Sequence, residues 1–514
     1  MNATKTLSFV PLDYRPFTCY TAVQIARIGG FRIDVPEPGR LGNYFIPGDS
    51  AAIGDWWARK AAGTAASVVA VPMLAYGGLI ASRYGGGISF EQAQNGLQVI
   101  KRVKEQNPDH KIYAFDAITR LTTSPFRDYP GNYSGKIREW SILQDKMTQP
   151  GMEHLKAECE AVKKTIPPQL IDDYLKARER NFAINKRMIE WVRDGIIDFL
   201  ILGQDDAEPY GMHRAERIEL MGRIEELGLG SKIKLFPGAD VIASLLIAKL
   251  ALEGAPASPK VCVEYSRRHG EQWIAPYQDI AYSQVIRDYV SVLGGEMADN
   301  AEQADIVLMA NTAGEQPIQS FAERIGAYLD DGRLVAVGDD AYAGTADPVL
   351  IELLRKRIRF SALSGYSGWN IGVSIAQALT RWTALQRSGR KDIDWRLQSA
   401  QAHAELLLEA LAHEEGYRNH VRNGAVAYAR SIGDDPQRLM AHYKEIDRYA
   451  VEHALPYGNQ WYQDHFQGER VALGAAGTQP LFGTITRLNG WQSGLPWNRT
   501  AEMEMFPELT VSVT

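Results

Sequence analysis

The segment Asp198–Asp206, DFLILGQDD, shows the pattern that decides the fold of this 514-residue chain. Four apolar residues are followed by a Gly-Gln turn and two acidic residues, which is typical of a strand buried on both faces of a sheet. The flanking segments Leu175–Asp194 and His213–Leu227 have apolar residues at helical spacing. Alternation of strand and helix predicts a parallel sheet with right-handed crossover connections.

The same alternation runs through roughly the first two thirds of the chain and predicts an α/β fold. The expected strands are Leu7–Leu12, Ser67–Leu74, Lys111–Phe115, Asp198–Leu202, Lys232–Phe236, Lys260–Val263, Asp305–Ala310, Leu334–Val337 and Arg359–Leu363. The other helices expected between them include Phe90–Gln106, Tyr282–Leu293, Ile318–Leu329 and Ile371–Leu385. The insertion Thr122–Pro168 interrupts this rhythm, and in a barrel we expect it to form a long loop over the mouth.

Two arrangements of these strands are open. A TIM-barrel-like parallel (β/α) body with a C-terminal helical region is the favoured one. The alternative is two open Rossmann-like α/β domains that divide near the linker Glu253–Pro259, EGAPASP. The expected division is an N-terminal α/β half at 1–255, a second α/β half at 256–390, and a helical region at 391–514 whose tail, Val471–Thr514, is irregular or β.

Composition narrows the class of protein. The net charge of −6 and the scattered basic residues argue against nucleic acid as a partner. No stretch approaches about eighteen apolar residues, so we expect no membrane partner. Three cysteines without a C-x-x-C spacing argue against a disulfide framework or a thiolate zinc site. We expect a cytoplasmic location, because no signal-like segment precedes the first strand, and we leave homo-oligomer formation open.

Acidic residues recur where the predicted strands end, and ligands of α/β proteins bind beyond the carboxyl ends of strands. The adjacent pair Asp205–Asp206 is the predicted catalytic centre, because the next helix begins only near His213 and N-capping explains the pair poorly. For Asp240 and Asp340, N-capping is an equal alternative. The predicted substrate-binding residues are Asp13, Arg15, Tyr76, Arg83, Asp116, Tyr210, His213, Asp240, Asp340, Tyr366, Trp369 and Asn370. Arg15, Arg83 and Arg120 are expected to hold the aspartates, and Trp497, Asn498 and Arg499 to fold back to the rim.

Two neighbouring carboxylates favour general acid–base chemistry, with one pKa raised by burial and by the other charge. The first hypothesis is a glycoside hydrolase that acts on a small-molecule or oligosaccharide substrate, without cofactor or metal. Substrate-assisted hexosaminidases are similar in one respect, since consecutive acidic residues end the fourth strand of their barrel. That analogy implies N-acetylhexosaminides as substrates, Asp206 as acid/base and Asp205 as the residue that orients the acetamide, or these two roles exchanged.

Two other classes stay open. One is a metal-dependent hydrolase or phosphoryl-transfer enzyme whose ligands are Asp13, Asp116, Asp205 and Asp206, since Mg²⁺ and Ca²⁺ prefer oxygen ligands. The other is a non-catalytic two-domain protein that binds a small molecule. The chain contains no P-loop, no dinucleotide fingerprint, no H-E-x-x-H and no G-x-S-x-G.

Five ordered motifs make the chain similar to a known family. They are PLDYRP at 11–16, ILGQDDAEPYGMHRAE at 201–216, PGADVIASLLIAK at 237–249, GYSGWNIGVSIAQAL at 365–379 and LPWNRT at 495–500. With them the chain resembles the bacterial domain-of-unknown-function family 4127 over essentially its whole length. This resemblance implies a bacterial α/β protein. The chain departs from the family pattern at Val241, where an acidic residue often stands, and at Ala501, where an aromatic residue often stands. If Val241 replaces a functional acid, the fifth strand matters less here.

Overall fold

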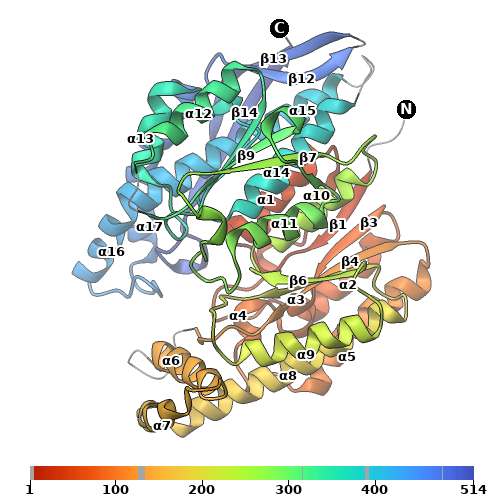
Figure 1. Ribbon diagram of the computed structural model, residues 1–514, viewed down its shortest axis with the longest axis vertical. Coiled ribbons are helices and arrows are strands. Elements are labelled where there is room, and N and C mark those ends of the chain that lie inside the picture. Colours follow the sequence, from red (N-terminus) through yellow and green to blue (C-terminus); the bar gives the residue numbers. More distant parts are fainter. Residues whose placement is uncertain (1–4, 125–132, 315–316, 388–392, 477, 514) are drawn as a thin grey trace.

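The computed structural model describes residues 5–124, 133–314, 317–387, 393–476 and 478–513. Its strands form one six-stranded sheet, one five-stranded sheet and a small three-stranded sheet near the C-terminus (Figure 1). Every pairing in the two larger sheets is parallel. The predicted α/β class is therefore confirmed.

The first sheet has the strand order β2-β1-β3-β4-β5-β6. Its strands are β1 (Thr6–Val10), β2 (Arg32–Asp34), β3 (Ala66–Ala70), β4 (Lys111–Ile118), β5 (Phe199–Gln204) and β6 (Ile233–Pro237). Its helices are α1 (Thr21–Ile28), α2 (Ser50–Ala61), α3 (Val71–Tyr76), α4 (Leu79–Ser82), α5 (Phe90–Gln106), α8 (Pro168–Arg193), α9 (His213–Glu226) and α10 (Ile242–Leu252). In Figure 1, α8 and α9 lie below the sheet and α1 and α10 above it. Residues of β3 and β5 are fully buried because helices cover both faces.

The second sheet has the order β11-β10-β9-β7-β8. Its strands are β7 (Lys260–Tyr265), β8 (Glu296–Met297), β9 (Ile306–Asn311), β10 (Leu334–Asp339) and β11 (Gly365–Ser367), and its helices are α11 (Tyr282–Val292), α12 (Gln319–Asp330), α13 (Pro348–Arg357) and α14 (Ile371–Gln386). Among the described residues the strands thus pair in two sheets, as in the alternative arrangement, and a single closed barrel is not confirmed.

Some predicted bounds were wrong. Arg359–Leu363 was expected to be a strand, but Phe360–Ala362 forms a 3₁₀ turn and the strand follows at Gly365–Ser367. The run Ser67–Leu74 divides between β3 and α3. The two short strands β2 and β8 lie at sheet edges and are three and two residues long, too short to give a recognisable period.

The two large sheets share one hydrophobic core, to which Val68 and Leu200 of the first sheet and Leu308 of the second contribute. Helices α1, α10 and α14 pack against one another within this core. Helix α10 is buried around its whole circumference, which explains why its sequence is apolar on all sides. The expected boundary at 255/256 falls in the connection from α10 to β7, and the division into domains stays a prediction.

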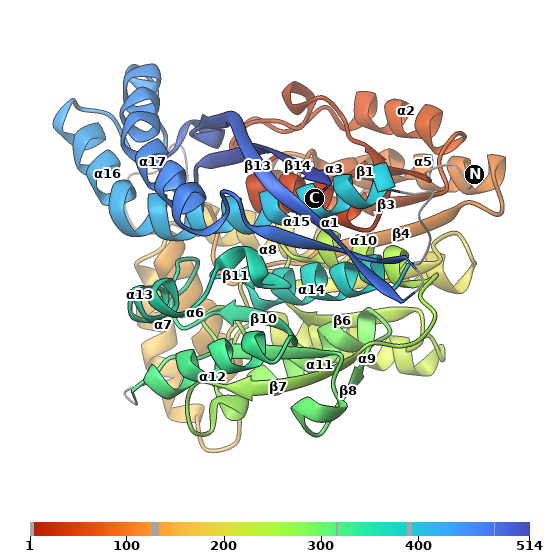
Figure 2. The same ribbon diagram turned by 90° about the horizontal axis from the view of Figure 1, so that it is seen from above.

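The predicted C-terminal helical region is confirmed. It contains α15 (Ile393–Ala410), the π-helical segment η8 (Leu411–Val421), α16 (Arg422–Ser431) and α17 (Tyr443–His465). The tail is β, with an antiparallel sheet of β12 (Arg470–Ala476), β13 (Gln479–Gly494) and β14 (Glu504–Val513). Figure 2 shows β13 and β14 crossing over α15, against which β14 packs.

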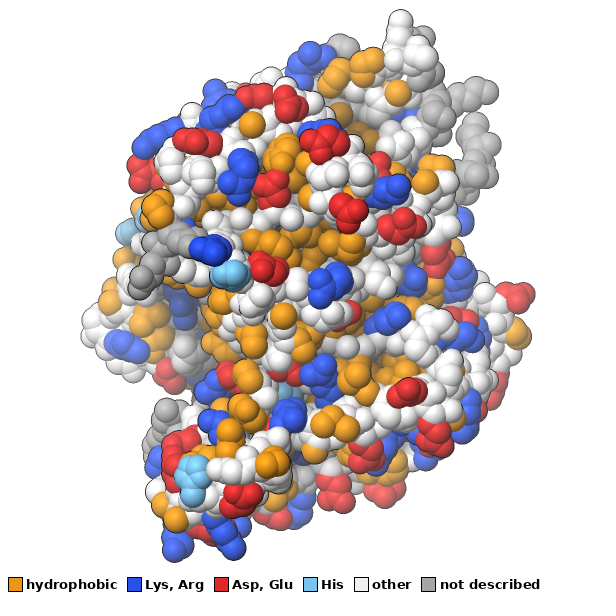
Figure 3. Space-filling view, in the orientation of Figure 1, with side chains coloured by type: hydrophobic (Ala, Val, Ile, Leu, Met, Phe, Trp, Pro, Cys, Tyr) orange, Lys and Arg blue, Asp and Glu red, His pale blue; other side chains and the backbone are white. Residues whose placement is uncertain are grey.

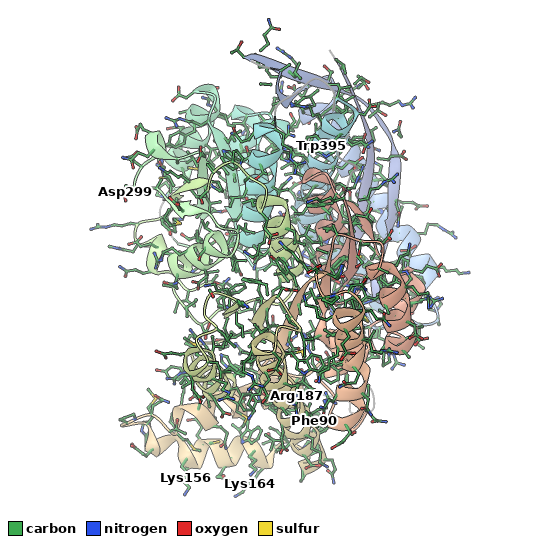
Figure 4. The ribbon with its side chains drawn as sticks, turned by 90° about the vertical axis from the view of Figure 1, so that its right-hand side faces the viewer. Phe90, Lys156, Lys164, Arg187, Asp299 and Trp395 are labelled. Carbon is green, nitrogen blue, oxygen red and sulfur yellow. The ribbon has the colours of Figure 1, made fainter. Side chains whose placement is uncertain are left out.

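The insertion is helical, and the prediction of a long loop over the mouth was wrong. Helices α6 (Tyr133–Lys146) and α7 (Lys156–Lys164) pack with the start of α8 around a small core of their own, which includes Trp140 and Cys159. Lys156 and Lys164 lie at the lower end of the molecule in Figure 4, opposite Trp395. Residues 125–132 of the insertion lie outside the described part of the chain.

Short segments complete the element order. They are the π-helical turn η1 (Pro16–Tyr20) and the 3₁₀ turns Pro38–Arg40, Glu153–Leu155, Gly270–Gln272, Ala301–Gln303, Phe360–Ala362 and Pro496–Asn498. Within the described ranges, no helix combines the length and the apolar character needed to cross a bilayer. Acidic and basic side chains are interspersed over the face shown in Figure 3.

Candidate active site

A cavity of about 320 Å³ lies where residues beyond the strand ends of both sheets meet. Residues that follow strands of the first sheet and line it are Arg15, Arg83, Arg120, Asp205, Asp206 and Asp240. The second sheet and its loops contribute Tyr277, Gln278, Asp340, Tyr342, Gly344, Trp369 and Asn370, and the C-terminal region contributes Arg418, Trp497 and Arg499. This size is within the range of small-molecule sites.

Arg15 holds two aspartates together. Its Nε and Nη2 donate to Asp13 at 3.0 and 2.9 Å, and its Nη2 and Nη1 donate to Asp240 at 2.8 and 3.2 Å. Burial raises the pKa of Asp240, and Arg15 opposes the shift. Helix α10 begins only at Ile242 and has no side-chain cap, so the N-capping alternative for Asp240 is not observed.

The two residues of the predicted catalytic pair each have an arginine partner. Arg83 donates from Nε and Nη2 to Oδ2 of Asp205, at 3.2 and 2.7 Å, and both side chains are almost fully buried. Asp206 lies 2.5 Å from Nη2 of Arg120, and 32% of its side chain is exposed. Asp206 has φ +41°, a conformation that non-glycine residues seldom adopt and that concentrates at functional sites. Burial raises its pKa and Arg120 opposes that shift.

Asp340 differs from these aspartates because it forms no ion pair with a lysine or arginine among the described residues. It follows β10, and the backbone N–H of Ile371, the first residue of α14, donates to its Oδ2 at 3.2 Å. Burial raises the pKa of Asp340 to about 6, against the opposing effects of the Tyr282 hydroxyl and the Ile371 N–H. Asp340 therefore both contacts the start of a helix, as in the capping alternative, and lines the cavity.

Two tryptophans give the cavity flat apolar faces. The guanidinium groups of Arg15 and Arg499 each lie 4.8 Å from the centroid of the Trp497 ring. Its backbone has φ +58°, and its N–H donates to the Tyr14 hydroxyl at 2.9 Å. Trp369 stacks on Phe17, with ring centroids 4.0 Å apart and planes 15° apart. Asn498, which was expected at the rim, is not among the lining residues.

Eight of the predicted site residues line the cavity, namely Arg15, Arg83, Asp205, Asp206, Asp240, Asp340, Trp369 and Asn370. Six do not, namely Asp13, Tyr76, Asp116, Tyr210, His213 and Tyr366. Asp13 lies behind Arg15 as its partner. Asp116 is buried, with a pKa raised to about 7 by that burial, and accepts a hydrogen bond from Asn185 at 2.7 Å.

The other four predicted residues, Tyr76, Tyr210, His213 and Tyr366, contact neighbouring groups outside the cavity lining. Tyr76 packs under the guanidinium of Arg180, 4.4 Å from its ring centroid. Tyr366 is buried below the second sheet's end, with its hydroxyl 3.5 Å from Asp339. Tyr210 lies beside the cationic groups of Lys146 and Arg214. Burial lowers the pKa of His213 to about 3, so that its ring is neutral.

Sequence reasoning missed several lining residues, among them Tyr277, Gln278, Tyr342 and Arg418. Tyr277 follows a proline in the connection between β7 and α11 and has φ +64°, so a Pro-Tyr loop signal was present in the sequence. Arg418 lies within η8 and has no local motif, and only the tertiary fold brings it to the cavity.

The all-aspartate cation site receives no support from the geometry. Among the described residues no group of three or more His, Cys, Asp or Glu side chains is arranged to hold a metal ion. Asp205 and Asp206 face arginines, and Asp13 and Asp116 lie outside the cavity lining.

A second cavity of about 350 Å³ adjoins the first. The two share Ile80, Arg83, Arg120 and Arg499 as wall residues. Thr122, Thr123 and Ser134, which flank the start of the insertion, form another part of its wall. Arg120, the partner of Asp206, thus lines both cavities.

A family model described as "Protein of unknown function (DUF4127)" matches residues 7–505. The chain belongs to this family. Each of the motifs that resembles the family places a side chain in the cavity wall of this family member: Arg15, Asp205 with Asp206, Asp240, Trp369 with Asn370, and Trp497 with Arg499. Val241, one of the two positions at which the chain departs from the family pattern, also lines the cavity. At the other position, Ala501, the backbone carbonyl accepts a hydrogen bond from Arg418 at 2.9 Å.

No curated protein matches the chain. Among solved structures, the carboxyl transferase domain from Rhizobium etli pyruvate carboxylase with 3-bromopyruvate aligns over 99% of this chain and 89% of that one. The sequence identity is 8% and the TM-score is 0.17, so this likeness carries no argument about fold or function.

Proposed function

We propose that the cavity is the active site of a glycoside hydrolase in which Asp340 is the general acid and Asp206 the second carboxylate. One observation carries the proposal: Asp206, after β5 of the first sheet, and Asp340, after β10 of the second, line the same cavity. Most glycoside hydrolases place one protonated and one ionised carboxyl group beside the scissile bond.

The surroundings of Asp340 and Asp206 favour different protonation states of their carboxyl groups. Asp340 has no cationic partner among the described residues, and its pKa of about 6 keeps a protonated fraction near neutral pH. Arg120 favours the ionised form of Asp206. The protonated acid would donate to the leaving oxygen, while the ionised group would act on the anomeric carbon directly or through water.

Asp205 fits a positioning role. Both hydrogen bonds from Arg83 go to its Oδ2, and no hydrogen bond among the described residues uses Oδ1. Oδ1 is thus available to accept from a substrate N–H. This supports the N-acetylhexosaminide hypothesis, in which Asp205 orients the acetamide.

The remaining wall suits a sugar. Trp369 and Trp497 place apolar ring atoms in the wall beside the carboxyl groups, where these atoms can contact the C–H groups of a sugar. The adjoining cavity provides space for a second residue of an oligosaccharide.

The test is hydrolysis of a panel of aryl glycosides that includes N-acetylhexosaminides, with and without a chelator. Turnover that survives chelation and falls about 10²–10⁴-fold in both Asp340→Asn and Asp206→Asn supports the proposal. Asp299→Asn, which changes an exposed aspartate that does not line the cavity, is the control and should leave turnover unchanged. Sugar binding without turnover, unaffected by either site variant, would favour the two-domain binding protein instead.

A further inference from the structure

The charges in the cavity wall do not all have partners within the protein. The wall contains five arginines and four aspartates. Four of the arginines are ion-paired: Arg15 with Asp13 and Asp240, Arg83 with Asp205, Arg120 with Asp206, and Arg499 with Glu502. Arg418 makes no ion pair with any residue that the structure describes. Among the arginines that line the cavity, Arg418 is therefore available to pair with an anionic ligand.

The surrounding contacts fix the position of the Arg418 guanidinium. Its Nη1 donates to the Ala501 carbonyl at 2.9 Å, and its Cζ lies 5.0 Å from the centroid of the Trp369 ring. Its Nε is buried without a partner, and no hydrogen bond among the described residues uses Nη2. A guanidinium fixed by stacking presents its free N–H groups with little further loss of side-chain entropy.

Gly344 keeps the space next to this group open. A Cβ at this position would lie 2.9 Å from the Trp369 ring and 3.3 Å from Nη2 of Arg418, and the backbone φ of +67° also favours glycine. The main chain therefore approaches the guanidinium without a side chain in between. Gly344 and Arg418 both line the cavity, so a side chain at position 344 would lie between the guanidinium and a ligand there.

A partly buried cation without a close counter-ion is unfavourable, and an anionic ligand would relieve this cost. Burial and the nearby Arg422 together lower the pKa of Arg418 to about 10, although Glu502 and Glu414 oppose the shift. The side chain remains charged at neutral pH. Planar guanidinium groups match the two oxygens of a carboxylate or a phosphate.

We propose that Arg418 binds a carboxylate or phosphate group of the substrate, so that the cavity selects acidic sugars over neutral ones. As a statement about substrate class this rests on the proposed glycoside hydrolase activity. The recognition of the acidic group itself does not depend on turnover. Binding experiments can therefore separate the two proposals.

The test uses calorimetric titration of the full chain with glucuronate, glucose 6-phosphate and glucose. We expect one or both acids to bind at least about tenfold more tightly than glucose, and the stronger of the two identifies the acidic group as carboxylate or phosphate. Arg418→Met keeps the stem of the side chain but removes the charge, and it should abolish this preference. Arg418→Lys should restore part of it, which separates the lost charge from a folding defect.

Arg355→Met is a matched control, because the Arg355 guanidinium also stacks on a tryptophan, 4.2 Å from the Trp461 ring, but does not line the cavity. It should leave the preference unchanged. Equal binding of acids and glucose by the unmodified protein, absence of binding by both acids, or an unchanged preference in Arg418→Met would each overturn the inference. Intact preference for an acid together with no turnover of any aryl glycoside would overturn the proposed function and leave this inference standing.

Discussion

At the scale of single residues, the cavity contrasts paired and unpaired charges. Asp205, Asp206 and Asp240 each contact an arginine, which favours their ionised forms. Asp340 is buried without a cationic partner among the described residues, so its pKa rises. The protonation of Asp340 thus differs from that of the three paired aspartates because the neighbouring side chains differ.

The first prediction concerns pH. The pKa of Asp340 is raised from 3.8 to about 6, so its protonated form should support kcat/KM at low pH, and activity should fall as pH rises through about 6. Asp340→Asn should lower kcat/KM and remove this limb of the pH–rate profile. The free energy of unfolding should depend on pH in the same direction. The stabilisation that comes from the raised pKa of Asp340 is complete below about pH 4 and is lost as pH rises through about 6. A variant profile that parallels that of the unmodified enzyme would contradict the assignment.

The second prediction concerns the Arg15 clamp. Arg15→Met leaves Asp13 and Asp240 without the cation that both contact. Because loss of one member of a buried ion pair leaves an uncompensated charge, we expect the free energy of unfolding to fall by about 3–5 kcal/mol. Urea denaturation monitored by tryptophan fluorescence measures it. Arg355→Met, on a partly exposed arginine, should change stability by less than about 1 kcal/mol; equal effects of the two variants would argue against the clamp.

At the scale of elements, two π-helical segments lie beside the cavity. Segment η1 begins directly after Arg15, and η8 contains Arg418. Phe17 of η1 stacks on Trp369, and Arg418 of η8 also lies against Trp369. Because π-helical geometry is rare and occurs often at functional sites, its presence on both sides of Trp369 supports the assignment of the cavity as the functional site.

The third prediction tests the junction of β5 and β6. A Cβ on Gly203 would overlap the carbonyl oxygen of Gly238 and the side chain of Ile242. Gly203→Ala should therefore destabilise the protein by about 1–3 kcal/mol and weaken ligand binding, since Asp205 and Asp240 follow this junction directly. Gly230→Ala is the control, because nothing lies within 4 Å of its added Cβ. Thermal unfolding and calorimetric titration measure both effects, and similar behaviour of the two variants would refute the prediction.

At the scale of the whole molecule, two sheets share one core and one cavity. Helices α1, α10 and α14 pack between them, and side chains from both sheets belong to the same hydrophobic cluster. The cavity needs both sheets, because its carboxyl groups come from β5 and β10. The relative placement of the sheets is therefore a condition for the proposed chemistry.

The fourth prediction follows from the shared core. Far-ultraviolet circular dichroism and tryptophan fluorescence should report one coincident unfolding transition, because separation of the sheets would expose α10 and α14. Two resolved transitions would contradict this and would favour independent domains that divide at 255/256. A ligand of the cavity should raise the midpoint of the single transition.

The sequence by itself determined the α/β class, most strand and helix positions, and the location of Asp205–Asp206 at a strand end. These features depend on the spacing of apolar residues within one element, which is a local property. The ninth strand, Arg359–Leu363, was misplaced because a short apolar run does not by itself distinguish a strand from a turn.

Only the tertiary structure decided that the parallel strands pair in two sheets, that Asp340 has no arginine partner among the residues the structure describes, and that Arg418 reaches the cavity. Strand–helix alternation is common to a barrel and to open sheets, and the hydrogen bonds that distinguish them join residues far apart in the sequence. The same holds for charge. Whether a buried aspartate acts as an acid or as the partner of an arginine depends on side chains that the fold brings from other elements.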